Sequence, residues 1–254
     1  MTIYFLIVLC GIFAGFIGTL AGLGAVLSLY LLIDVVELDA TIANGTNRLG
    51  VLAMALMALP TFKKNGHLNL EKSKFIISCI VIGAIGGFAV AIYAQEQAIK
   101  QFFKYLLPFL LFVILSNPKK WMRETEQDFR MNPLLSLPLF LAIGFYAGFI
   151  QAGTGVLLVV VLTLFARYSL IDANGVKLSA FAIYTGLGIL VFALNGKVDW
   201  VYGGFLALGQ GIGGYTAAQF ATSYPGANQL VRYLLIMVLV AAIFRMFECY
   251  QYFV

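Results

Sequence analysis

The two most deeply placed charges in the sequence are Arg48 and Lys177, and both are cations. All 11 acidic residues fall instead in bends, loops or the C-terminal tail, between long apolar segments. A charge inside a membrane span costs roughly 2.5–3.5 kcal/mol on insertion scales, so a retained one usually has a function. Two cations without an acid at the same depth predict binding of an anion. The alternative is that both side chains are interface anchors that reach water by snorkelling.

Each cation belongs to an Asn-Gly box that follows a glycine-rich apolar segment. The first box is Asn44-Gly-Thr-Asn-Arg48, and the second is Asn174-Gly-Val-Lys177. A helix broken by glycine exposes backbone N–H groups at the start of its second half, where the helix dipole favours anions. The predicted anion-binding residues are Arg48, Lys177, Asn44, Asn47, Asn174, Thr19, Gln151, Thr154, Gly22, Gly24, Gly153 and Gly155.

Two other interpretations of these residues stay open. Gly11, Gly15, Gly18 and Gly22 recur every three or four positions, which is also typical of closely packed helices. Close packing and a broken helix can coexist in one segment. A single Asn or Thr in a span is more often an interhelical contact than a ligand, and only the pairing across two boxes favours binding.

The composition places these residues in a membrane protein. The chain has 254 residues, of which 62% are hydrophobic and 11% charged, and its mean hydropathy is +0.96. Soluble domains carry about 25% charged residues. The net charge of +5 is spread over short loops without a basic, aromatic-rich stripe, which argues against nucleic-acid binding. We therefore expect an all-α polytopic protein whose partner is the lipid bilayer.

Hydropathy predicts about eight spans separated by polar bends. Two of these segments exceed the roughly 20 residues that a straight span needs, and glycines interrupt both. The predicted spans are 3–33, 42–62, 75–94, 102–115, 134–165, 174–194, 200–220 and 230–247.

The sequence also predicts an internal duplication. Gly11 and Gly15 match Gly144 and Gly148, and the Asn-Gly box at 44 matches that at 174. We expect two homologous four-span repeats, 1–116 and 134–254, each with a glycine-broken first helix, joined by a cytoplasmic linker at 117–133. The repeats are parallel if each broken segment crosses the membrane, and inverted if each turns back.

The basic loops indicate an orientation. Lys and Arg concentrate in loops 63–74 and 117–133, which the positive-inside rule places in the cytoplasm. With eight crossings, both termini are then cytoplasmic as well.

No constellation typical of an enzyme is present in the sequence. Cys10, Cys79 and Cys249 are far apart and show no metal or redox spacing. The glycine string at 209–214 lies inside an apolar span and has no preceding strand, so it is no nucleotide fingerprint. We expect no catalytic activity, no cofactor and no metal site.

The Gly11–Gly24 segment, the Asn44–Arg48 box and their echoes at 148–155 and 174–177 resemble the sulfite exporter TauE/SafE family of bacterial and archaeal transporters. The likeness covers about residues 5–247. It implies seven to nine spans in the cell (inner) membrane and export of small sulfur-containing anions such as sulfite, sulfoacetate or other organosulfonates.

Together these observations predict a secondary transporter that exports a sulfur-containing anion through a central polar site between the repeats. One alternative is an anion channel that uses the same cations, and another is a cysteine-dependent sulfur relay. A homodimer is expected only because such dimers are common.

Overall fold

The computed structural model describes residues 2–93 and 131–224 continuously, together with a few single positions outside these ranges. The predicted spans 102–115 and 230–247, the linker 117–133 and Cys249 lie wholly or mostly outside the described residues.

The described residues form α-helices and one π-helical turn, and none of them is in a strand. The elements are α1 (Thr2–Leu20), α2 (Gly24–Tyr30), the π-helix η1 (Leu31–Val35), α3 (Ala40–Lys64), α4 (Leu70–Ala91), α7 (Pro133–Phe149), α8 (Thr154–Leu164), α9 (Leu170–Leu194) and α10 (Trp200–Ser223). By length and composition, α1, α3, α4 and α9 are apolar and long enough to cross a membrane. The chain is therefore an all-helical, multi-pass membrane protein.

Polar residues in the bends explain where the helices begin. Asp39 accepts hydrogen bonds from the first free N–H groups of α3, and Asp199 does the same for α10. Asn69, Asn132 and Ser169 cap α4, α7 and α9. Each side-chain oxygen satisfies backbone donors that would otherwise lack partners. Several polar residues of the bends are therefore helix caps.

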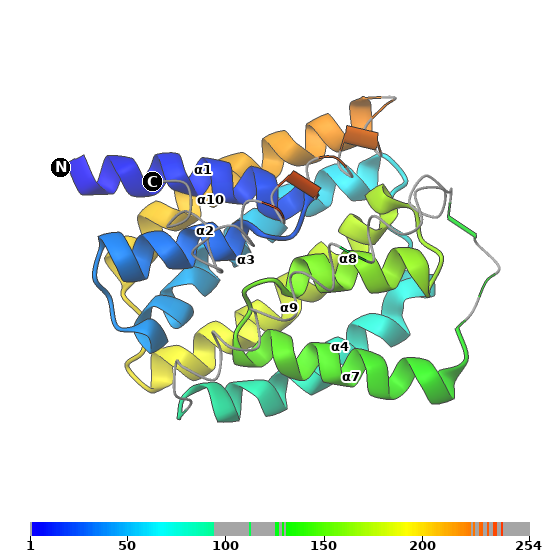
Figure 1. Cartoon of the computed structure of the whole chain (residues 1–254), viewed down its shortest axis with the longest axis horizontal. Helices are drawn as coiled ribbons and strands as arrows, with labels where there is room; N and C mark the ends of the chain where they lie inside the picture. Colours follow the sequence, from blue (N-terminus) through cyan, green and yellow to red (C-terminus); the bar gives the residue numbers. More distant parts are fainter. Residues whose placement is uncertain are drawn as a thin grey trace.

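The first apolar segment turns back on itself. Helix α1 ends at Leu20, and α2 begins at Gly24. Gly24 lies so close to Ala14 that a Cβ would overlap the Ala14 carbonyl oxygen. Further along, Leu31 packs in one cluster with Ile7. Because later residues contact progressively earlier ones, α1 and α2 form an antiparallel hairpin (Figure 1).

The segment 133–164 forms a second hairpin. Pro133 and Ser136 at the start of α7 line the same cleft as Ala166 and Tyr168, which follow α8. The two ends of this segment therefore lie together, as the ribbon also shows (Figure 1). Of the two arrangements that the sequence left open for these segments, crossing and turning back, the structure has a turn in the middle of each.

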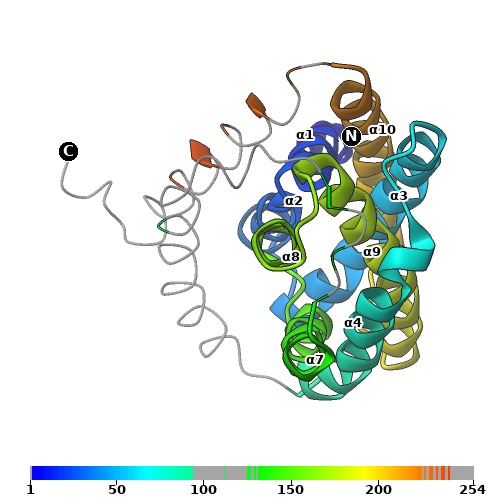
Figure 2. The same ribbon diagram turned by 90° about the vertical axis from the view of Figure 1, so that its right-hand side faces the viewer.

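The helices are arranged in two layers (Figure 2). One layer holds the hairpins α1–α2 and α7–α8, and the other holds α3, α4, α9 and α10. Glycines allow the layers to approach: Gly213 of α10 packs on Ile12 of α1, and Gly87 of α4 packs on Phe145 of α7. The buried apolar core lies between the layers.

Helix directions follow from which residues touch. Gly11 contacts Gly209 and Ile12 contacts Gly213, so α1 and α10 are parallel. The pairs Gly83–Leu141 and Gly87–Phe145 make α4 and α7 parallel in the same way. In contrast, α3 and α9 are antiparallel, because Gly45 contacts Phe192 and Arg48 contacts Gly188. The N-terminus and the α3–α4 loop lie at opposite ends of the molecule (Figure 1).

Candidate functional site

The two interrupted segments meet at their interruptions. Gly22 has φ +81°, a conformation that glycine adopts easily, and it lies directly against Gly155. A Cβ added to Gly155 would lie 2.5 Å from the Gly22 Cα. Gly153, with φ +74°, is the N-cap of α8. In this conformation the breaks contact each other through backbone, so Gly22 and Gly155 act as packing residues here.

Lys177 lies in α9 and holds the end of α1. Its Nζ donates to the carbonyl oxygens of Gly18 at 2.9 Å and Thr19 at 2.7 Å, and to Oδ1 of Asn174 at 2.6 Å. Asn174 in turn donates to the Leu20 carbonyl at 3.1 Å. A lysine ammonium has three donors, and all three are used. The cation also lies at the negative end of the α1 dipole.

Arg48 and Asn44 in α3 hold the end of α7 in the same manner. Arg48 Nη2 donates to the Gly148 carbonyl at 2.6 Å, and Asn44 Nδ2 donates to the Phe149 carbonyl at 3.2 Å. Each Asn-Gly box therefore caps the first helix of the opposite hairpin. Both boxes therefore act on a helix that is distant in the sequence, α3 on α7 and α9 on α1.

Arg48 differs from Lys177 because most of its N–H donors have no hydrogen-bond partner among the described residues. Its side chain is fully buried, yet Nε and Nη1 have no hydrogen-bond partner among the described residues. The guanidinium lies between two rings, with Cζ 5.0 Å from the centroid of Phe88 and 4.6 Å from that of Phe192. Buried, unpaired N–H groups on a cation are costly, so their retention indicates a function. They are suited to accept an anion.

A polar network lies beside the breaks. Asn47 Oδ1 accepts from Ser28 Oγ at 2.6 Å and from Gln210 Nε2 at 3.4 Å, and Asn47 Nδ2 donates to Gln151 Oε1 at 3.4 Å. Gln151 Nε2 donates to Thr185 Oγ1 at 3.1 Å. Gln151 has φ +64°, which is unusual for a residue with a side chain. This strained backbone turns its amide towards α3 and α9.

The two predicted threonines lie at the breaks. The hydroxyls of Thr19 and Thr154 are buried and lack partners among the residues described. All twelve predicted residues are therefore gathered around the two breaks and the boxes that cap them. Ser28, Thr185, Phe88 and Phe192 also belong to this region, and the sequence alone does not single them out.

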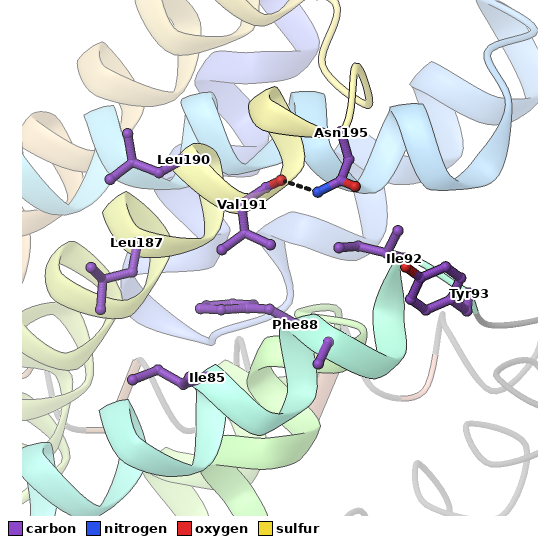
Figure 3. Close-up of a pocket in the computed structure, with 9 residues that line it drawn as sticks. Ile85, Phe88, Ile92, Tyr93, Leu187, Leu190, Val191 and Asn195 are labelled. Atoms are coloured by element: carbon purple, nitrogen blue, oxygen red, sulfur yellow. Dashed lines mark hydrogen bonds between the residues drawn. The ribbon is translucent and has the colours of Figure 1, made fainter.

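A cleft lies next to this region. A cavity of about 550 Å³ opens between α4 and α9, and Phe88 forms part of its lining (Figure 3). Neither Arg48 nor Lys177 lines it. Both cations are fully buried, so the central site is closed to solvent, and Phe88 touches both this cleft and the Arg48 guanidinium.

Comparison with known proteins identifies the family. The sequence profile described as "Sulfite exporter TauE/SafE" matches residues 7–246. The chain belongs to the TauE/SafE family. Family membership agrees with the all-helical architecture and makes the chain a membrane transporter of this type. No solved structure matches the chain significantly.

The names of related proteins describe membrane transporters in general terms. The chain is 26% identical over 229 residues to "Probable membrane transporter protein YfcA" of Escherichia coli K12, covering 89% of this chain and 82% of the relative. It is 28% identical to a "Probable membrane transporter protein" of Haemophilus influenzae, with 82% and 81% covered. A protein of Xylella fastidiosa with the same name is 27% identical, with 96% and 97% covered. None of these names states a substrate.

Proposed function

We propose that this protein is a secondary transporter that exports a small sulfur-containing anion such as sulfite, sulfoacetate or another organosulfonate. The observation that carries the proposal is the buried guanidinium of Arg48, which retains unpaired Nε and Nη1 groups. The family's name, sulfite exporter, supports a sulfur oxyanion as the substrate.

An anion is the ligand that Arg48 requires. The ion pairs between described residues, His67–Asp172 and Arg167–Glu126, do not involve it. A planar guanidinium presents neighbouring N–H groups that match two oxygens of a sulfonate or sulfite, as they do for carboxylates and phosphates. The flanking rings of Phe88 and Phe192 keep water away, which strengthens this interaction.

The contacts favour different roles for the two cations. All three N–H donors of Lys177 bind α1 carbonyls or Asn174, so we assign it a structural role as a helix cap. Arg48 donates one hydrogen bond to α7, and we propose that its unpaired Nε and Nη1 groups bind the substrate. Asn47, Gln151 and the hydroxyl of Thr154 are placed to complete the oxyanion site when the breaks separate.

We further propose that 1–116 and 134–254 are inverted repeats. The order hairpin, long helix, long helix occurs twice, and the equivalent helices α3 and α9 run in opposite directions. Transporters with inverted repeats bind substrate near the middle of the membrane, between interrupted helices, and alternate access by rocking one half against the other. The contact between Gly22 and Gly155, one from each interruption, fits this arrangement.

The hairpins change the expected orientation. If the basic loop 63–74 is cytoplasmic, the N-terminus, at the opposite end of the molecule, faces outward. This replaces the expectation of a cytoplasmic N-terminus, which depended on α1–α2 crossing the membrane. A membrane-impermeant label on a cysteine placed at Thr2 tests the assignment in intact cells.

Counterflow of ³⁵S-labelled sulfoacetate in proteoliposomes tests the function. Arg48→Lys keeps a charge that can cap Gly148 but loses the paired N–H groups, so we expect a loss of affinity of at least about tenfold. Lys64→Met, at an exposed helix end, is the control and should transport normally. Wild-type transport by both Arg48→Lys and Arg48→Gln would refute the site, and unsaturable conductance would identify a channel.

A further inference from the structure

One buried tyrosine of α9 has a hydroxyl group without a hydrogen-bond partner. Among the described residues, the buried tyrosines are Tyr146, Tyr168 and Tyr184. Tyr146 donates to the Ala152 carbonyl at 2.7 Å, and the Tyr168 hydroxyl lies 3.1 Å from Ser73 Oγ. Tyr184 is fully buried, and its hydroxyl has no partner in the part of the chain that the structure describes. It is the exception among the three.

Retaining this hydroxyl makes the folded protein less stable than it could be. Phenylalanine would fill the same space without a desolvated polar group, and buried tyrosines usually find a partner for the hydroxyl. Thr185 and Gln151 lie near the Tyr184 hydroxyl, but they bond to each other, with Gln151 Nε2 donating to Thr185 Oγ1 at 3.1 Å. The hydroxyl is therefore available to a ligand.

Tyr184 lies between the levels of the two buried cations. Along α9, Lys177 precedes Tyr184 by about two turns, and Gly188 follows it by about one turn on the same face. A Cβ at Gly188 would lie 2.8 Å from Nη1 of Arg48, one of its unpaired donors. The Tyr184 side chain and the Arg48 guanidinium are also close enough to interact electrostatically. Two kinds of unpaired donor, a guanidinium and a phenol, are thus buried close together.

We propose that Tyr184 is a further ligand of the substrate, donating its hydroxyl hydrogen to an oxygen of the anion that Arg48 binds. The inference rests on the proposed function and adds a binding residue to that site. A planar guanidinium meets two oxygens in its own plane, so the third oxygen of a sulfonate or sulfite needs a donor from another direction. Edge-to-face packing on Phe181, with ring centroids 5.5 Å apart, holds the Tyr184 ring in place. Tyr184 therefore favours a head group with three oxygens over a flat carboxylate.

The variant Tyr184→Phe removes only the hydroxyl group. We expect binding of labelled sulfoacetate to the purified protein to weaken about tenfold or more, because a hydrogen bond to a charged group is lost. Without ligand, the melting temperature should equal or exceed that of wild type, because the variant lacks the unpaired buried hydroxyl.

Tyr168→Phe is the matched control. It makes the same change at another buried tyrosine, whose hydroxyl pairs with Ser73 outside the proposed site. Loss of one ordinary hydrogen bond should lower the melting temperature by about 2–4 °C. The affinity for sulfoacetate should match that of wild type. The two variants are thus expected to show opposite patterns of stability and binding.

A comparison of head groups separates a direct contact from a general disturbance of the site. Methanesulfonate and acetate each compete with labelled sulfoacetate for wild type and for both variants. Wild type and Tyr168→Phe should prefer methanesulfonate. Tyr184→Phe should lose most of this preference, because only the sulfonate has a third oxygen for the hydroxyl to bind.

Three results would overturn the assignment, and they differ in what else they contradict. Wild-type affinity in Tyr184→Phe, combined with weaker binding in Arg48→Lys, would exclude Tyr184 from the site and leave the transporter function standing. A lower melting temperature in Tyr184→Phe with an unchanged preference between the two anions would give the hydroxyl a structural role. Failure of wild type to bind any sulfonate would contradict the proposed function as well.

Discussion

Replacing Lys177 by methionine separates a structural role from a role in binding. Methionine has a similar length and no charge, so the main change is the loss of three donors. The carbonyls of Gly18 and Thr19 and the Asn174 oxygen would then be buried without their partner. Each buried acceptor left unsatisfied costs about 1–3 kcal/mol, and removing a desolvated charge returns part of that. We expect a net loss of about 3 kcal/mol.

The assay is thermal unfolding of the purified protein in detergent. A change of 1 kcal/mol shifts the melting temperature of a chain of this size by about 2–4 °C, so Lys177→Met should melt roughly 6–12 °C lower. Lys64→Met, at the exposed end of α3, should change stability by less than about 1 kcal/mol. A melting temperature within about 2 °C of wild type, combined with loss of sulfoacetate binding, would refute the structural assignment and make Lys177 a substrate ligand.

Three further changes test the centre of the molecule. Gly155→Ala should lower the free energy of unfolding by about 3 kcal/mol or more, because its Cβ would meet the Gly22 backbone. The control Gly204→Ala, in open space, should cause no measurable loss in the same unfolding assay. Gln151→Gly should be about 1 kcal/mol more stable than Gln151→Ala, since glycine relieves the positive φ; equal melting temperatures would show no strain there. Replacing Cys10, Cys79 and Cys249 together by alanine should leave counterflow unchanged. Abolished transport would instead support a cysteine-dependent sulfur relay.

The long helices could be predicted from sequence with good boundaries. The span expected at 42–62 is α3 at Ala40–Lys64, and that expected at 200–220 is α10 at Trp200–Ser223. Both follow from apolar runs of membrane length between capped polar bends. In the structure Gly22 and Gly153, in the two glycine-rich stretches, adopt positive φ values that other residues rarely take.

The reversal of each interrupted segment was not predictable in the same way. A glycine break has the same local sequence whether the helix kinks onward or turns back. The direction is decided by distant packing, here of Gly24 on Ala14 and of Gly22 on Gly155. The proposed orientation of the N-terminus depends on this reversal as well.

The different contacts of the two cations, on which their proposed roles rest, were also hidden in the sequence. Their boxes look alike, and each cation follows an Asn-Gly pair. What distinguishes them is the number of hydrogen-bond acceptors that surround each side chain. Lys177 meets enough acceptors to satisfy every donor, and Arg48 meets one beside two aromatic rings. Such a count depends on contacts between residues more than 100 positions apart along the chain.

The most direct test of the central claim is the melting temperature of wild type and Arg48→Gln against sulfite, sulfate, thiosulfate, sulfoacetate, taurine, chloride and phosphate. A ligand at 100 times its Kd stabilises the folded state by about 2.7 kcal/mol, which corresponds to roughly 5–11 °C here. We expect a sulfur-containing anion to raise the wild-type melting temperature by this amount and to leave Arg48→Gln unchanged. An equal rise in Arg48→Gln would contradict the assignment of the anion to Arg48.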